Sequence, residues 1–170
     1  TTMTKDGKDI NVRTVDKYLE GFVESFFLYK ASRYDIKGKQ YLKTGEKYYV
    51  SDLALRYFIL GRKIGDYGHI LENIVYLELI RRGYDVFIGK ADDYEIDFVA
   101  INNNGRLYVQ VADTLKGKDE NDTKILEREL RALKNINDNY EKLVLTSDKI
   151  PLMNEDGIII RNVLEWLLDK

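Results

Sequence analysis

The stretch YEIDFVAINNNGRLYVQVADTL, residues 94–115, decides how the rest of this sequence folds. Two runs rich in β-branched and aromatic residues flank the turn NNNG, and this pattern predicts two antiparallel strands joined as a hairpin. A symmetric loop pairs Ile101 with Arg106, and the same register places Asp97 opposite Gln110. The hairpin therefore brings two polar side chains face to face inside otherwise apolar strands.

Alternation with a period of two divides the hairpin residues between two faces. One face is apolar. The other, taken as the polar face where chemistry could sit, carries Glu95, Asp97, Val99, Tyr108, Gln110 and Ala112. The same geometry also fits a structural pair, because a hydrogen bond to the Gln110 amide would satisfy a half-buried Asp97 without any metal.

Helices and strands are predicted outward from the hairpin by the spacing of apolar residues. Residues 65–83 form a helix that stops at Gly83. The further elements are a strand at 84–89, an amphipathic helix at 121–136, strands at 142–148 and 157–162, and a last helix at 163–169. From residue 66 the order is α-β-β-β-α-β with an added β-α, which indicates an α/β domain over residues 63–170.

The sequence of the first part of the chain predicts a smaller module. Residues 14–24 form a short amphipathic helix with Thr14 as its N-cap, and residues 52–61 form a second helix. Between them, a ribbon rich in Tyr and Phe turns at KGK, residues 37–39. Helix, aromatic ribbon with a basic loop, and helix is the order of a winged-helix-like module, predicted here for residues 1–62.

Composition limits the classes of protein that this chain can belong to. In 170 residues, 44% are hydrophobic and 33% are charged, as in soluble globular proteins with one or two domains. No apolar run approaches the roughly 20 residues of a membrane span, and the sequence has neither a secretory signal pattern nor a cysteine. We expect a cytoplasmic protein, and the start without methionine suggests a piece of a longer one.

Charge is unevenly distributed along the chain. Residues 1–60 hold 11 Lys+Arg against 8 Asp+Glu, whereas residues 61–170 hold 16 against 21, so the excess changes from +3 to −5. Basic groups interleaved with aromatic residues suit contact with nucleic acid, although such ribbons are also ordinary packing on a solvated surface. The candidate nucleic-acid-binding residues are Arg13, Lys17, Lys30, Arg33, Lys37, Lys39 and Lys43.

Several chemistries are excluded by the residues present. His69 is the sole histidine, so a cluster of histidine ligands cannot form, and we expect it at the surface near the start of its helix. The sequence contains no cysteine nucleophile and no G-x-S-x-G elbow. Arg128 and Arg131, among Glu127 and Glu129, predict a solvated helix face with local ion pairs.

The order of a helix carrying Glu72, the hairpin, an amphipathic helix and a strand resembles the restriction-endonuclease-like fold over residues 66–148. In that superfamily, written PD-(D/E)xK, two carboxylates hold Mg²⁺ and a lysine activates the attacking water. The resemblance implies that the helical Glu is Glu72, the Asp is Asp97, the second carboxylate is Gln110 and the lysine is Ala112. Two of these four positions differ in type, so Glu72, Asp97 and Gln110 are expected to form a vestigial site, with Asp97 and Glu72 as ligands if a metal binds.

A closer resemblance covers nearly the whole chain. Segments such as KYYVSDLALRYFILG, GHILENIVYLELIRRGYDVFIGK, EIDFVA and YVQVADTL look like the C-terminal domain of unknown function of prokaryotic AAA-type ATPases. The resemblance implies a winged-helix-like segment and a restriction-endonuclease-like domain after an N-terminal ATPase domain. This sequence has no G-x-x-x-x-G-K-[ST] phosphate-binding loop, so ATP hydrolysis is not assigned to it.

The resulting hypothesis is a non-catalytic recognition region of an AAA-type ATP-binding protein, contacting DNA through the ribbon turn and helix 14–24. No cofactor is expected in these residues, and Mg²⁺ only if the nuclease-like site is functional. One alternative is a metal-dependent nuclease with an atypical site, in which Lys90, Arg106 or Lys116 replaces the missing lysine. Another is a protein-interaction module for the ATPase domain or for a homo-oligomer, with no membrane contact in any of the three.

Overall fold

The computed structural model describes residues 11–61, 65–116 and 122–169. The chain divides into two compact units, Thr1–Lys30 with Tyr48–Gly61, and Ala31–Lys47 with Arg62–Lys170. The middle of the ribbon thus belongs to the second unit, whereas the sequence prediction assigns the whole ribbon to a module that ends at residue 62. This difference matters for function, because the ribbon turn and Lys47 are then part of the larger unit.

The first unit contains the two helices predicted from its sequence. Helix α2 spans Val12–Glu24 and begins at Asn11, whose side chain accepts a hydrogen bond from the Arg13 amide at 3.0 Å. Thr14 is therefore not the N-cap, since its own amide already bonds to the Asn11 carbonyl at 2.9 Å. Helix α3 spans Leu53–Leu60, and neither helix contains a buried residue.

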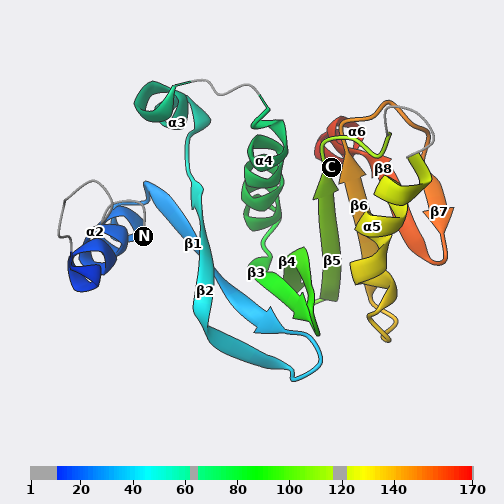
Figure 1. The fold of residues 1–170 in the computed structure, drawn as a ribbon, viewed down its shortest axis with the longest axis horizontal. Helices are drawn as coiled ribbons and strands as arrows, with labels where there is room; N and C mark the ends of the chain where they lie inside the picture. The colour runs from blue at the N-terminus through cyan, green and yellow to red at the C-terminus, as the bar shows by residue number, and fades with distance from the viewer. Residues whose placement is uncertain (1–10, 62–64, 117–121, 170) are drawn as a thin grey trace. The chain divides into compact units, whose positions relative to one another are not determined.

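A single mixed sheet has the strand order β2-β1-β3-β4-β5-β6-β8-β7 (Figure 1). Its strands are β1 Leu28–Asp35, β2 Gln40–Val50, β3 Asp85–Ala91, β4 Tyr94–Asn102, β5 Gly105–Ala112, β6 Glu141–Thr146, β7 Met153–Glu155 and β8 Ile158–Asn162. The pairs β3–β4, β4–β5 and β7–β8 are antiparallel, and β1–β3, β5–β6 and β6–β8 are parallel. The predicted α/β class with a large mixed sheet is confirmed, while β7 was not anticipated.

Helices cover both faces of the sheet in the second unit. Helix α4, Tyr67–Arg81, contacts β3, β4 and β5, and its Tyr76 ring lies 5.9 Å from the ring of Phe98. Helix α5, Asp122–Lys134, contacts β4, β5 and β6 and buries Leu133 in a cluster with Val99 and Tyr108. Because Phe98 and Val99 are consecutive in one strand, these two helices lie on opposite faces.

The last helix, α6, spans Val163–Leu168 and contacts β6 and β8. Among the described residues, no helix combines the length and the apolar character that crossing a membrane demands.

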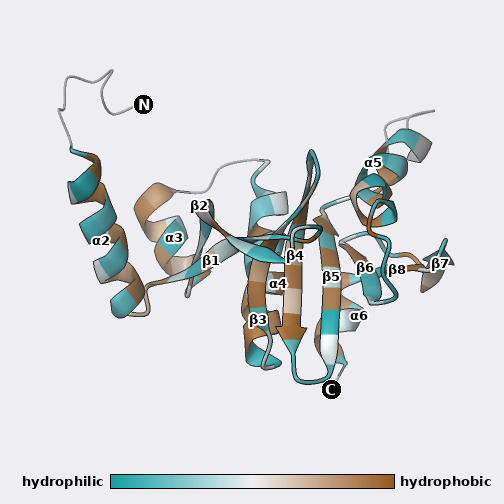
Figure 2. Ribbon diagram, turned by 90° about the horizontal axis from the view of Figure 1, so that it is seen from below, coloured by the Kyte–Doolittle hydropathy of each residue, from teal (hydrophilic) through white to brown (hydrophobic). Residues whose placement is uncertain are grey.

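The face of the hairpin that was predicted to be polar is mostly core. Val99, Tyr108 and Ala112 are buried on it beneath α5, so that expectation was wrong for most of the face. Figure 2 shows hydrophobic colouring over much of β4 and over part of β5, where hydrophilic residues interrupt it. Period-two alternation could not reveal this, because a helix distant in sequence supplies the cover. Only the neighbourhood of Asp97 and Gln110 keeps a polar character.

The turn sets the hairpin register as predicted, with Ile101 opposite Arg106. On the other side of β4, the pairing with β3 shifts between Phe87 and Gly89. A Cβ atom at Gly89 would lie 2.8 Å from Cγ2 of Val99 and 3.0 Å from Cβ of Ile96. The irregularity therefore depends on a residue without a side chain, at a point where the core approaches the backbone.

We predict that Gly89→Ala lowers the free energy of unfolding by about 1–3 kcal/mol, because the added methyl group overpacks the core. The matched control is Gly68→Ala in α4, where a Cβ atom meets nothing within 4 Å. That variant should be neutral or up to about 1 kcal/mol more stable, since alanine favours helix. Urea unfolding followed by circular dichroism measures both, and equal stabilities of the two variants would contradict the packing described at Gly89.

Candidate functional site

The central hairpin opens at Asp97 and Gln110. Backbone pairing of β4 with β5 runs from the turn as far as Phe98 and Val109. At the next position, the Asp97 amide donates to the Gln110 side-chain oxygen at 3.4 Å, and the Val111 amide donates to Asp97 Oδ2 at 2.8 Å. Asp97 and Gln110 are thus neighbours, as predicted. The carboxylate is held by the Val111 backbone rather than by the Gln110 amide.

Helix α4 and strand β2 bring two opposite charges to this opening. Glu72 of α4 is largely buried, and its Oε1 lies 3.1 Å from Nζ of Lys47 in β2. The same ammonium lies 2.9 Å from Oε1 of Glu95, a carboxylate that also pairs with Arg33. His69 is exposed in the first turn of α4, as expected, with Nδ1 3.9 Å from Glu72 Oε2. The site therefore has a lysine, supplied by β2.

Sequence reasoning missed Lys47 because no local pattern distinguishes it from its basic neighbours. It precedes the run Tyr48–Val50 in a ribbon whose lysines are spread over its whole length. Lys90, Arg106 and Lys116 were the substitutes considered, and none of them is an ion-pair partner of Glu72 or Asp97 among the interactions of the described residues. Only the return of β2 to the sheet shows which lysine approaches Glu72.

The Gln110 side chain also bonds to a residue of α5, on the face of the sheet opposite α4. Its Nε2 donates to Glu129 Oε2 of α5 at 3.2 Å, and Arg128 donates to Glu129 Oε1 at 2.6 Å. Glu129 is only 8% exposed, so the prediction of a solvated helix face was wrong for this residue. The error has a physical reason: α5 turns Glu129 toward the opening of the hairpin, where Gln110 provides a buried donor.

The carboxylates around Asp97 change its titration. Burial, reinforced by the negative charge of Glu72, raises the pKa of Asp97 to about 7, although the Val111 amide and Lys47 act in the opposite direction. Burial alone would lower the pKa of Lys47, but its contact with Glu95 and the charges of Glu72 and Asp97 raise it. At Asp97, burial and neighbouring negative charge thus outweigh the effect of Lys47, while the Lys47 ammonium itself is held protonated.

Magnesium is the metal that the resemblance implies, and its hard oxygen ligands would have to come from Glu72, Asp97 and Gln110. Among the described residues, no group of three or more His, Cys, Asp and Glu side chains is arranged to hold a metal ion. One oxygen of each group is also engaged, since Lys47 pairs with Glu72 Oε1, the Val111 amide donates to Asp97 Oδ2, and the Gln110 oxygen accepts from the Asp97 amide. The donor set as arranged does not fit Mg²⁺.

The predicted nucleic-acid-binding residues fall into separate places. Arg13, Lys17 and Lys30 are exposed in the first unit. In the second unit Arg33 is already bound to the Gly45 carbonyl at 2.8 Å and to Glu95. Lys37 and Lys39 lie together at the ribbon turn, and the side chain of Lys43 lies outside the described residues.

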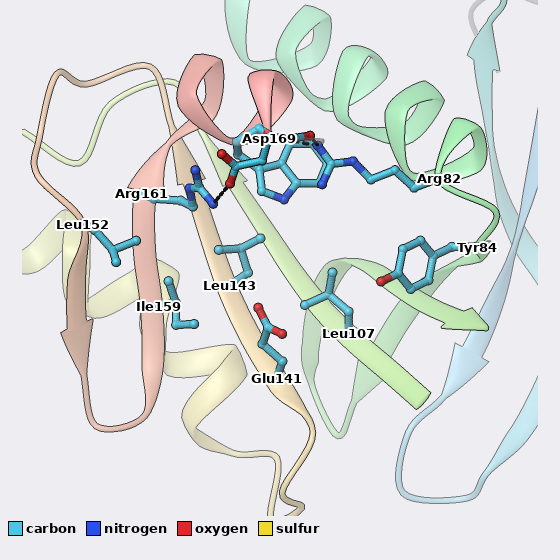
Figure 3. A pocket seen from close by; sticks show the side chains of 10 residues that line it. Arg82, Tyr84, Leu107, Glu141, Leu143, Leu152, Ile159, Arg161 and Asp169 are labelled. Atoms are coloured by element: carbon cyan, nitrogen blue, oxygen red, sulfur yellow. Dashed lines mark hydrogen bonds and ion pairs between the residues drawn. The ribbon is translucent and has the colours of Figure 1, made fainter. Parts of the chain in front are cut away.

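A cavity of about 370 Å³ lies on the sheet face that carries α4 and α6 (Figure 3). Among the charged groups that line it, Arg161 binds Asp169 at 2.6 Å, Arg82 lies over the Trp166 ring at 4.2 Å, and Glu141 is exposed. Arg82 also donates to the Trp166 carbonyl at 2.6 Å. These contacts close the end of α6 onto α4, so the cavity has a structural explanation.

Comparison with known proteins gives relatives that are themselves described as uncharacterized. A protein of Haemophilus influenzae is 42% identical over 167 residues, which are 98% of this chain and 40% of that protein. A protein of Methanocaldococcus jannaschii is 28% identical over 144 residues, which are 82% of this chain and 32% of that protein. The chain thus spans two fifths or less of the length of these relatives. No family model and no solved structure matches it.

We predict that Asp97→Asn removes a pH dependence of stability. In the unfolded chain this carboxyl ionises near its ordinary pKa, so between about pH 4 and pH 7 the unfolded state loses the proton first and the wild type becomes less stable. Asparagine has no proton to lose and still accepts from Val111. Relative to wild type, the variant should gain about 1–3 kcal/mol between about pH 5 and pH 8.

Thermal and urea unfolding across this pH range measure the difference. Glu72→Gln is the matched control, because it removes the neighbouring negative charge and should weaken the pH dependence without abolishing it. Parallel stability profiles for wild type and Asp97→Asn would show that Asp97 is not a group with a raised pKa.

Proposed function

We propose that this chain is a recognition region that contacts nucleic acid and belongs to a longer, AAA-type ATP-binding protein. In this proposal residues 63–170 are a restriction-endonuclease-like domain and residues 1–62 a winged-helix-like module. The order of α4, the strands β3, β4 and β5, then α5 and β6 supports the first assignment. The greater length of both relatives leaves room for an ATPase domain.

The observation that carries the non-catalytic part of the proposal is the internal pairing of the nuclease-like site. Gln110 links the Asp97 backbone to Glu129, and Lys47 links Glu72 to Glu95. Each of these groups has a protein partner where a nuclease would present oxygens to a metal. Such a site stabilises the sheet and leaves binding to other surfaces, first of all the ribbon turn with Lys37 and Lys39.

Protein partners are part of the same proposal. Helix α3 leaves Phe58 88% exposed and Ile59 62% exposed, an apolar surface of the kind used in protein contacts. The ATPase domain of the longer protein and a second copy of this chain are the proposed partners. We assign the work to the cytoplasm, where an ATP-binding protein that contacts DNA would act.

We predict that the chain binds DNA with an affinity that falls as salt rises, because lysine contacts release counterions from phosphates. Fluorescence anisotropy between about 50 mM and 200 mM salt measures the slope of log affinity against log salt. The Lys37→Ala/Lys39→Ala variant should reduce that slope by up to about two units, at roughly 0.9 per phosphate contact. A Lys116→Ala/Lys149→Ala control, at two exposed lysines elsewhere, should leave it unchanged. Absent or salt-insensitive binding would refute the proposal.

A metal-dependent nuclease with an atypical site is the second candidate, and the position of Lys47 favours it. Nζ of Lys47 lies 3.1 Å from Glu72, and its charge acts on Asp97, so β2 could supply the lysine that β5 lacks at Ala112. The present pairing of Glu72 with Lys47 opposes this candidate, because a metal would have to displace the ammonium from the carboxylate.

We predict no cleavage when DNA is incubated with the purified chain and Mg²⁺ or Mn²⁺. Gel analysis of a labelled duplex and of a single strand measures this, with Asp97→Ala and Lys47→Ala run in parallel. Cleavage that disappears in both variants would establish the nuclease candidate in place of the non-catalytic one. Cleavage that survives both changes would come from a contaminant, because neither side chain of the site would then be needed.

A further inference from the structure

A cavity of about 340 Å³ lies between the ribbon turn and the connection from α5 to β6. Its apolar lining consists of Ile36, Ala91 and Ile136, each less than 10% exposed. Lys37 and Lys39 line it from the ribbon turn, and residues 135–138 line it from the connection. The cavity therefore combines an apolar lining with two cations and an edge of amide side chains, and all of its residues belong to the second unit.

Some of these polar groups are already used by the fold. Asp138 accepts from the Tyr108 hydroxyl at 2.6 Å and from the Tyr140 amide at 3.2 Å, and Asn135 donates to the Arg131 carbonyl at 3.0 Å. Asn137 and Lys39 are exposed, and neither side chain bonds to another described residue. The groups open to a ligand are therefore the Asn137 amide and the Lys39 ammonium.

Lys37 has a partner that a ligand can displace. It forms an ion pair with Asp92, and the two side chains are 56% and 51% exposed. Exposed pairs of this kind contribute little and exchange readily with other charges. A phosphate near the ribbon turn can take the place of Asp92, so both lysines are available to an anion.

We propose that this cavity takes an unpaired base of a single-stranded nucleic acid, while Lys37 and Lys39 hold the flanking phosphates. The inference rests on the proposed nucleic-acid contact and names its substrate class. Apolar walls suit the faces of a base, an amide offers the donor and acceptor that base edges require, and ammonium groups neutralise phosphates. A stacked duplex does not present a base in this way, because entering a pocket requires unstacking.

The test uses three labelled ligands with the 170-residue chain, of which the two single strands carry equal numbers of phosphates and the duplex about twice as many. They are a single strand of about 12 nucleotides, an abasic strand of equal length, and the corresponding duplex. Fluorescence anisotropy at one salt concentration measures the affinities. We expect the ordinary single strand to bind about tenfold more tightly than either other ligand. The abasic strand has no bases to contact, and the bases of the duplex are stacked and paired.

Three variants at exposed positions make the test specific to this cavity. Asn137→Ala should lower affinity for the ordinary strand severalfold and leave the abasic strand unchanged, whereas Lys39→Ala should weaken both. Asp92→Asn should strengthen both, because it frees Lys37. Lys149→Ala, at an exposed lysine outside the cavity, is the matched control and should change neither. Circular dichroism melting confirms that each variant is folded.

The outcomes separate this inference from the function on which it rests. The proposal that the cavity binds a base is refuted if ordinary and abasic strands bind with equal affinity. It is also refuted if Asn137→Ala weakens binding of both strands equally. Either result leaves the proposed nucleic-acid contact intact. A preference for the duplex has the same two consequences. Binding to none of the three ligands overturns the base cavity and the proposed function together.

Discussion

The hydrogen bond from the Val111 amide to the Asp97 carboxylate replaces a strand-to-strand bond at the point where β4 and β5 part. Beyond this point β4 pairs with β3, and β5 pairs with β6. A buried amide must be satisfied wherever a ladder opens, so the carboxylate is a structural requirement before it is anything else. The opening, in turn, is what gives Glu72 and Glu129 access to the middle of the sheet.

A buried carboxylate at position 97 is stabilised by a nearby cation, and the fold supplies Lys47, a residue distant in the sequence. Lys47 comes from β2, on the edge of the sheet, and its ion pairs with Glu72 and Glu95 join that ribbon to α4 and β4. The compensation is incomplete, because the pKa of Asp97 stays near 7 despite Lys47. A raised carboxyl pKa of this kind is often found at functional sites, and here it falls on one of the residues that the sequence predicted for the site.

Within residues 94–115, the sequence predicts the strand register correctly but not which face of the hairpin is buried. The turn NNNG and the alternating strands fix the register that joins Asp97 to Gln110, because both depend on neighbours within the hairpin. The same alternation failed for the face of Val99 and Tyr108, since α5 covers it from a later part of the chain. Lys47 and Glu129 were missed for a related reason. Their roles depend on where two distant elements return to the sheet, and periodicity carries no information about such returns.

The opened hairpin around Asp97 and the ribbon turn with Lys37 and Lys39 differ in charge, and this difference gives them different physical roles. Around Asp97, burial and the negative charges of Glu72 and Glu129 raise the pKa of the carboxyl, and Lys47 offsets them only in part, so an anionic backbone would be repelled unless a metal intervened. At the ribbon turn Asp138 is turned inward to Tyr108 and Asp35 accepts from the Gly38 amide, so among the described residues Lys37 pairs with Asp92 and Lys39 has no ion-pair partner. In the proposed contact with nucleic acid, a phosphate would therefore meet an unpaired ammonium at the turn, whereas the carboxylates near Asp97 would repel it.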